Sequence, residues 1–493
     1  MLGKRWSTVA LLTMASFVLP ALAQDDEPGR GVVRISVLNG DVSVRRGDSG
    51  DQVAAAINAP LVVHDRVFTG PASRAELQFD WANFLRIASA AEVRLAELEH
   101  RRYMVQLARG TVTWRFLRDS DAYIEISTPS VSVRPVKRGA YRVTVLDDGS
   151  TEITVRSGEA EIFTPQGSER LRSGRTMFAR GTASNPEFRV GDDIPEDDWD
   201  RWNDVRDRDL ERSRSYQYMS RDIYGAEDLD HHGRWVQVPQ YGYVWSPRVV
   251  AGWAPYRHGR WVWMDWYGWT WVSYDPWGWA PYHYGRWFHT AGYGWCWWPG
   301  AVSVRHRWSP GLVAFFGFGR VSVGLGWGRV GWVPVGPHEP FHPWWGGRYY
   351  SGYRSRGYVD NSVNVVNNVN ITNIYRNSRI GDAVTVVDGD GFRRGRSGTH
   401  VRVTDGELRT ASMARGPVPV TPERESLRFA DRDVSVAPRT FRGNDRFFSN
   451  RRPSETERVP FEEQRRGVEQ IARRNFGESP GTSAVAERGV DRS

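Results

Sequence analysis

The sequence predicts a mainly β protein with four parts: an N-terminal β domain, a short helical connector, a Trp-rich domain of three β-hairpin repeats, and a disordered C-terminal tail. Three observations predict this class. Apolar and polar residues alternate in many short runs between residues 31 and 180, as they do in strands with one buried face. One unit recurs three times after residue 233, and nineteen of the 24 tryptophans lie between residues 235 and 345. Large apolar residues become rare from about residue 391.

The first 23 residues have the features of a secretory signal peptide. Lys4 and Arg5 give a positive start, residues 9–19 form a short apolar core, and Ala21-Leu22-Ala23 is a small-x-small cleavage site. We therefore expect a mature chain that begins at Gln24 and is periplasmic or secreted. No later stretch is apolar for the roughly 18 residues that a membrane helix needs, so we expect no transmembrane span after signal cleavage.

The N-terminal β domain is expected over residues 31–180. Val33, Ile35 and Val37 alternate with polar neighbours, and an Asn39-Gly40 turn signal precedes a second alternating run at residues 42–44, which predicts a β-hairpin. The same period recurs at residues 75–79, 112–116, 141–145 and 153–155. Many short strands with tight turns predict a sandwich, barrel or roll.

Six short motifs are spread over residues 31–165: Gly40-Asp41-Val42, Ala59-Pro60-Leu61, Asp65-Arg66-Val67-Phe68-Thr69, Ser73-Arg74-Ala75-Glu76-Leu77, Leu107-Ala108-Arg109-Gly110 and Ser127-Thr128-Pro129. Together they resemble the FecR-type domain of bacterial envelope proteins. In the best-known members this domain is a periplasmic relay in iron-uptake signalling, preceded by a cytoplasmic anti-sigma limb and a membrane span. This sequence shows neither, so we do not expect that signalling role to carry over. Residues 135–140 also depart from the Gly-Thr that the family often has there.

Residues 192–224 predict a helical connector. Pro195 suits a helix start, and Trp199, Trp202 and Leu210 are spaced for one helix face. We expect the tryptophan pair to be the buried face of a helix that docks on a neighbouring domain.

The Trp-rich domain, residues 225–345, contains copies that begin at Gly233, Gly259 and Gly285, which are 26 residues apart. Four positions recur in register: Arg234, Arg260 and Arg286; Trp235, Trp261 and Trp287; Tyr241, Tyr267 and Tyr293; Trp245, Trp271 and Trp297. A fixed period indicates stacked repeats, with the atypical third copy as a cap. Because neighbouring side chains of a strand face opposite ways, we expect the tryptophan of each Gly-Arg-Trp to face inward and its arginine to line the outside.

Further motifs accompany these repeats: residues 225–230, Gly233-Arg234-Trp235, residues 253–256, residues 277–283 and Trp332-Val333-Pro334. From Trp199 to about Pro343 the sequence resembles a domain of uncharacterised function that follows FecR-like domains in secreted bacterial proteins. The resemblance implies an architecture and brings no established activity with it.

The aromatic repeats carry the main functional signal. Aromatic faces stack on sugar rings and peptide backbones, and neighbouring arginines hold carboxylates or phosphates. The alternative is structural, because a short hairpin has little aliphatic content and tryptophan must then supply its core. We assign Trp235, Trp261, Trp287, Trp245, Trp271 and Trp297 to the repeat core. Ligand binding is assigned to Arg234, Arg260, Arg286, Tyr241, Tyr267 and Tyr293, with peptidoglycan, another envelope glycan or an envelope protein as the expected partner.

Other chemistry finds little support in the sequence. His338-Glu339-Pro340-Phe341-His342 fits a zinc-protease pattern, but its prolines oppose the helix that this motif requires, so we expect a loop and no metal. The remaining histidines share no repeat position, and Cys296 is expected to be a small buried residue. Acidic residues are interspersed among the arginines that give the net charge of +8, which argues against nucleic acid. We expect a non-catalytic binding or scaffold protein without cofactors. The alternative is an accessory of FecR-type envelope signalling that touches a transporter or sensor.

Two segments remain. Residues 346–390 include an alternation of apolar residues with asparagine that predicts an edge strand or a β-arc. Residues 391–493 are rich in Arg, Glu, Ser, Pro and Gly, which predicts a disordered tail with at most a short helix at residues 465–474.

Overall fold

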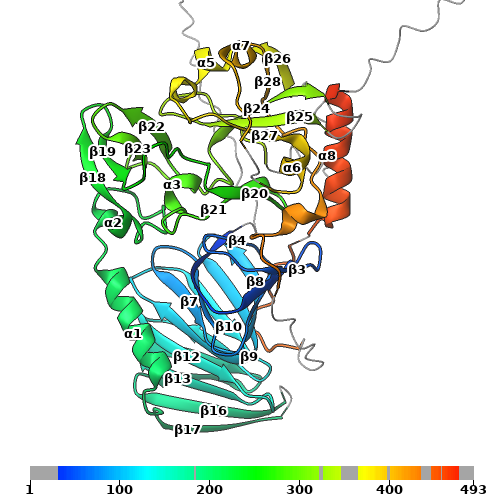
Figure 1. Ribbon diagram of the computed structural model, residues 1–493. Coiled ribbons are helices and arrows are strands. Elements are labelled where there is room, and N and C mark those ends of the chain that lie inside the picture. Colours follow the sequence, from blue (N-terminus) through cyan, green and yellow to red (C-terminus); the bar gives the residue numbers. More distant parts are fainter. Residues whose placement is uncertain are drawn as a thin grey trace, which may run out of the picture.

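The computed structural model describes residues 31–182, 185–320, 326–345, 365–396, 400–434, 446–456 and 458–476. Figure 1 shows a large β domain at one end with helix α1 along its side, the Trp-rich hairpins beyond it, and a smaller sheet at the far end. The predicted signal peptide lies outside the described residues. Among the helices within these ranges, none combines the length and apolar character that crossing a membrane requires.

The N-terminal domain contains seventeen strands that form one continuous hydrogen-bonded system. In chain order they are β1 Val33–Asn39, β2 Val42–Arg45, β3 Gln52–Ala54, β4 Pro60–Leu61, β5 Arg66–Thr69, β6 Arg74–Gln78, β7 Asn83–Ile87, β8 Glu92–Glu99, β9 Arg102–Phe116, β10 Tyr123–Ser127, β11 Ser132–Pro135, β12 Gly139–Val145, β13 Thr151–Ser157, β14 Glu159–Thr164, β15 Gly167–Arg172, β16 Arg175–Thr182 and β17 Asn185–Asp192. The domain therefore extends past its predicted end at residue 180.

Strand β9 joins the two halves of this system. Its first half pairs with β8 and β10, and its second half pairs with β7 and β12. Gly110 marks the change, with φ of 82° and a position where a Cβ atom would lie 2.6 Å from Ala91. Only glycine fits this backbone and this approach. The alternation predicted at residues 141–145 is confirmed, since Tyr141, Val143 and Val145 are buried in the core.

The hairpin predicted at Asn39-Gly40 is wrong. β1 pairs with β4 and β6, whereas β2 pairs with β3 and β5. Gly40 does take the left-handed conformation, with φ of 74°, and the Ser73 hydroxyl accepts from the Asp41 amide beside it. The turn therefore forms where the sequence predicts it, but it connects two groups of strands. β1 and β2 do not pair with each other, because each pairs with strands further along the sequence.

Helix α1, Asp198–Glu211, is the predicted connector. The Asp197 carboxylate caps it by accepting from the amides of Trp199 and Asp200, so the helix begins three residues after Pro195. Trp199 and Trp202 stack with ring centroids 5.1 Å apart, and the Trp199 indole donates to Thr113 of the β domain. The helix thus docks on its N-terminal neighbour. The short helices η1, Ser215–Gln217, and α2, Leu229–His232, lead into the repeats.

Each repeat copy forms the predicted β-hairpin. The strands are β18 Gly233–Val238 with β19 Gly242–Pro247, β20 Gly259–Met264 with β21 Gly268–Ser273, and β22 Arg286–Thr290 with β23 Gly294–Trp298, and helix α3, Ala280–His283, precedes the last pair. The hairpins do not stack in chain order. Copies one and three join in a four-stranded sheet in which Trp245 lies opposite Trp297, and the middle copy stands apart as a two-stranded unit.

The far sheet draws strands from three predicted segments. It has the order β26-β28-β24-β25-β27, with β24 Val313–Arg320, β25 Trp327–Pro334, β26 Val365–Val369, β27 Thr385–Asp388 and β28 Ala411–Ala414. β26 is the edge strand predicted from the asparagine alternation. Around these strands lie α5 Ile371–Ile374, η2 Arg376–Arg379, α6 Gly389–Arg393, α7 Asp405–Leu408 and η3 Arg424–Leu427.

The predicted disordered tail is wrong for much of its length. Val418, Val420, Leu427 and Phe429 are buried in the main core, and α8, Phe461–Phe476, buries Phe461 and Val468. These few apolar residues are enough because they enter a core that the aromatic repeats have already built, so the segment needs no core of its own. Residues 477–493 lie outside the described part of the chain.

Candidate binding face of the tryptophan-rich repeats

The hairpin register gives every copy two distinct faces. The two repeated tryptophans lie opposite each other in each pair: Trp235 with Trp245, Trp261 with Trp271, and Trp287 with Trp297. They therefore share one face, which we call the inner face. The repeated arginine is the strand neighbour of the first tryptophan and belongs to the opposite, outer face.

The inner faces form the centre of the molecule. Trp245, Trp261, Trp271, Trp287 and Trp297 are at most 2% exposed, and only Trp235 of the six is half-buried. Trp235 stacks on Tyr218, with ring centroids 5.0 Å apart. Several indoles also bind the backbone, since those of Trp245, Trp287 and Trp297 donate to the carbonyls of Leu229, Pro281 and Tyr284.

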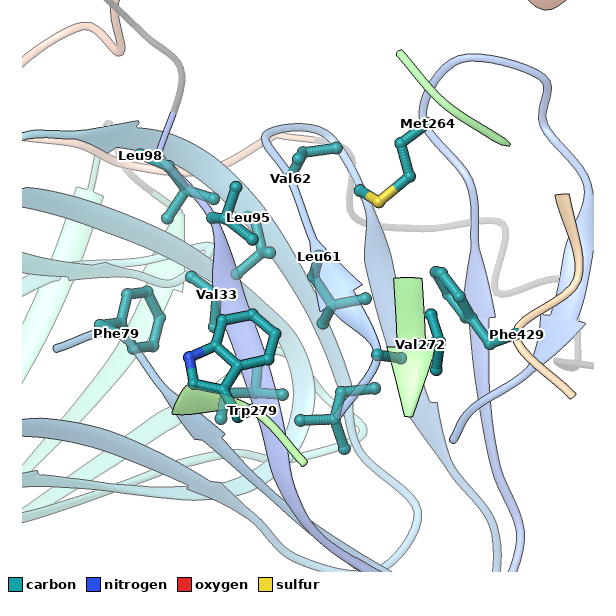
Figure 2. Close-up of a cluster of buried hydrophobic side chains, with 14 of the residues drawn as sticks. Val33, Leu61, Val62, Phe79, Leu95, Leu98, Met264, Val272, Trp279 and Phe429 are labelled. Atoms are coloured by element: carbon teal, nitrogen blue, oxygen red, sulfur yellow. The ribbon is translucent and has the colours of Figure 1, made fainter. Parts of the chain in front are cut away.

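The outer face of the middle copy is covered. Figure 2 shows Met264 and Val272, both from this face, beside Leu61 and Val62 of the N-terminal domain and Phe429 of the C-terminal segment. The Arg260 side chain is 3% exposed and donates to the Asp431 carboxylate at 3.0 Å. The expectation that Arg260 lines the outside is therefore wrong, although its face is the predicted one. Tyr267 is likewise buried, with its ring 4.8 Å from that of Trp308.

Among the described residues, the outer face of copies one and three is only partly covered: Val244 and Cys296 are buried, whereas Arg234 is exposed. Three half-buried rings meet on it: the Tyr241 ring lies 4.6 Å from Phe288 and 5.6 Å from Trp298. The imidazole of His338, which is exposed, lies 5.4 Å from Trp298. Flat rings with one free side can stack on a sugar ring or on another aromatic side chain. We call Tyr241, Phe288, Trp298, Arg234 and Arg286 the open face.

The two arginines of the open face differ in their surroundings. Arg234 is exposed, and its guanidinium lies 5.6 Å from the centre of the Tyr293 ring, which is 42% exposed. Arg286 lies over the Phe341 ring at 5.2 Å and donates to the carbonyl of Gly285. Burial lowers the pKa of Arg286, whereas Tyr256 and Glu339 raise it. A guanidinium that has lost part of its hydration shell forms a stronger electrostatic interaction with a bound anion than a fully exposed guanidinium does.

Sequence reasoning missed two members of the open face and the histidine beside it. Phe288, Trp298 and His338 were not among the predicted binding residues, because only positions shared by all copies were considered. Phe288 and Trp298 stand where the middle copy has Val262 and Val272. An aromatic residue unique to one copy, at an outward position, was the signal that could have identified them.

The zinc-protease pattern has a structural explanation. Residues 336–343 form a loop, as predicted, and Glu339 ties the start of this loop to η2 by accepting from the amides of Gly336 and Arg376. Within the described ranges, no three acidic, histidine or cysteine side chains are grouped as a metal site would require. Cys296 is buried beneath the open face, and burial raises its pKa to about 11, so its thiol stays protonated.

Comparison with known proteins places two regions of the chain in families. Residues 65–161 match the FecR protein family, and residues 226–339 match a family of unknown function, DUF6600. Two crystal structures of a candidate anti-sigma factor from Parabacteroides distasonis match at 15% and 16% identity, each with a TM-score of 0.23. Each match covers 26% of this chain and 59% of the solved chain. No curated protein matches. The chain therefore carries a FecR domain followed by a Trp-rich region of the DUF6600 family.

Proposed function

We propose that this protein is a non-catalytic binding or scaffold protein of the bacterial cell envelope that holds a wall glycan or an envelope protein on its open face. The single observation that carries the proposal is the contrast between equivalent surfaces. The middle copy buries its outer face within the molecule, whereas among the described residues copies one and three carry half-buried rings, the half-buried Arg286 and the exposed Arg234 on theirs. Rings and guanidinium groups grip and orient a ligand, which is the chemistry of binding.

The envelope location is part of the proposal. It is supported by the signal-like residues 1–23 and by the FecR domain. N-terminal sequencing of the protein from fractionated cells should give Gln24 in the periplasmic or secreted fraction. An intact Met1 in a membrane-bound form would contradict this location.

The binding itself is tested by co-sedimentation of the full chain with fragments of purified cell envelope. The protein should pellet with them, and Arg286→Gln and Tyr241→Ser should reduce the pelleted amount. The effect of Arg286→Gln should be larger at low salt, because added salt screens the attraction between charged groups. Arg466→Gln, an exposed arginine on α8, is the matched control. Protease-treated fragments, which retain glycan and lose protein, distinguish the two ligands. If the protein does not pellet, or if all variants pellet equally, the proposal is wrong.

The FecR domain favours one alternative, an accessory of FecR-type signalling that touches a transporter or sensor. Such a protein would contact its partner through residues 65–161. Its attachment to untreated envelope fragments would then survive Arg286→Gln and Tyr241→Ser, and would be lost when exposed residues of the FecR domain are changed.

A further inference from the structure

The covered outer face of the middle copy holds a peptide segment of the same chain. Residues 424–433 lie against it: η3 packs on β20, the Phe429 ring lies beside Met264 and Val272 (Figure 2), and Asp431 pairs with Arg260. The N-terminal domain secures the segment through Arg46, which donates to the Leu427 carbonyl and lies 5.3 Å from the centre of the Phe429 ring. The segment thus contributes an aromatic anchor and, two residues later, a carboxylate.

Among the described residues, each equivalent arginine of the open face has a ring beside it but no paired carboxylate: Phe341 lies over Arg286, and Tyr293 lies beside Arg234. Arg234 and Arg286 occupy the repeat position of Arg260, on the same side of their strands. Neither forms an ion pair with a carboxylate of the residues that the structure describes, and Arg286 donates only to the neighbouring Gly285 carbonyl. The rings of Tyr241, Phe288 and Trp298 supply the apolar half of the site.

We propose that the open face binds an extended peptide segment of a partner protein, in which an aromatic residue is followed two positions later by Asp or Glu. This inference rests on the proposed function and chooses a protein over a glycan as the ligand. The aromatic residue packs against Phe288 and Trp298, and the carboxylate accepts from Arg286 or Arg234, as Asp431 accepts from Arg260. A charged acceptor on a partly desolvated guanidinium makes one of the stronger hydrogen bonds, and ring pairs add specific packing.

The test uses a fluorescent synthetic peptide with the sequence of residues 424–433, titrated into the full chain and followed by anisotropy. The chain's own segment already fills the middle copy, and its tether gives it a high local concentration, so the added peptide reports on the open face. Arg286→Gln and Arg234→Gln should weaken binding, by about tenfold for the arginine that holds the carboxylate. Peptides with D431N or F429A should bind more weakly, and the control Arg466→Gln should bind normally.

Each outcome separates this inference from the proposed function. Peptide binding that is weakened by substitution of the open-face arginines supports the inference. A protein that no longer pellets with envelope fragments once these have been treated with protease supports it as well. If the peptide fails to bind while protease-treated glycan still pellets the protein through Arg286, the inference is overturned and the proposed function stands. If peptide binding depends on Arg260 alone, the ligand exchanges into the middle copy and the inference is overturned as well. If substitutions in the open face change neither the affinity for the peptide nor the amount of protein that pellets with envelope fragments, both proposals are wrong.

Discussion

Replacing Trp261 by alanine should destabilise the protein more than any other single change in the repeats. Its ring is 2% exposed and lies between 4.8 and 6.5 Å from the rings of six partners: Tyr256, Trp271, Phe315, Trp332, Trp344 and Phe392. These partners come from the middle hairpin and the residues just before it, from strands β24 and β25, from the segment after β25 and from helix α6, so the side chain joins parts distant in the sequence. Deleting a buried tryptophan costs about 3–5 kcal/mol, and with so many ring partners we expect the upper half of that range.

The equivalent residue of copy one provides the matched control. Trp235 occupies the same repeat position but is half-buried, so Trp235→Ala should cost roughly 1–2 kcal/mol, which is ordinary for a partly buried site. Urea unfolding of both variants, followed by tryptophan fluorescence and checked by limited proteolysis, measures the difference as a shift in midpoint. Equal midpoints for the two variants, or a larger loss for Trp235→Ala, would refute the division into a buried core and an accessible first copy.

Two further predictions concern the parts that surround the repeats. Burial raises the pKa of Glu76, but the charges of Arg206 and Arg86 outweigh this effect and lower the pKa from 4.5 to about 2. The ionised Glu76 therefore contributes its full stabilisation above pH 4.5, and this contribution is lost as the pH falls toward 2. Glu76→Gln should therefore lower the urea midpoint at pH 7 and reduce its further fall between pH 4.5 and 2; a fall as steep as in the unmodified protein would contradict the assignment. Phe429→Ala removes a fully buried ring at a cost of about 3–5 kcal/mol and should expose residues 424–433 to protease, whereas Glu425→Ala, at an exposed position of the same segment, should not; equal cleavage of both would show that Phe429 does not anchor the segment.

The sequence was informative wherever a local pattern determines structure. The 26-residue period located all three hairpins, and the alternation of side chains placed Arg260 and Trp261 on opposite faces. Those predictions depend only on strand geometry. The connector helix and the Pro-rich loop at His338 followed from equally local rules, namely helix periodicity and the steric limits of proline.

The failures all involve pairing between distant segments. The Asn39-Gly40 turn is correctly placed, yet its two strands bind other partners. Likewise, the composition of residues 400–434 gives no sign that Phe429 will be buried, because neighbours of its ring such as Val272 and Arg46 belong to distant segments. The burial of Arg260 has the same origin, since the repeat pattern fixes its face but cannot show that distant segments enclose it and that Asp431 pairs with it. Which copies keep an open face is therefore visible only in three dimensions.

Hydroxyl-radical footprinting of the full chain, alone and with envelope fragments, tests the central claim most directly. In the free protein, Tyr241, Phe288 and Trp298 should react faster than Trp261 and Trp271, because only the first group has exposed ring surface. Addition of envelope fragments should protect those three rings and leave the two buried tryptophans unchanged. Protection confined to residues 65–161, or free-state reactivity of Trp261 equal to that of Trp298, would contradict the account.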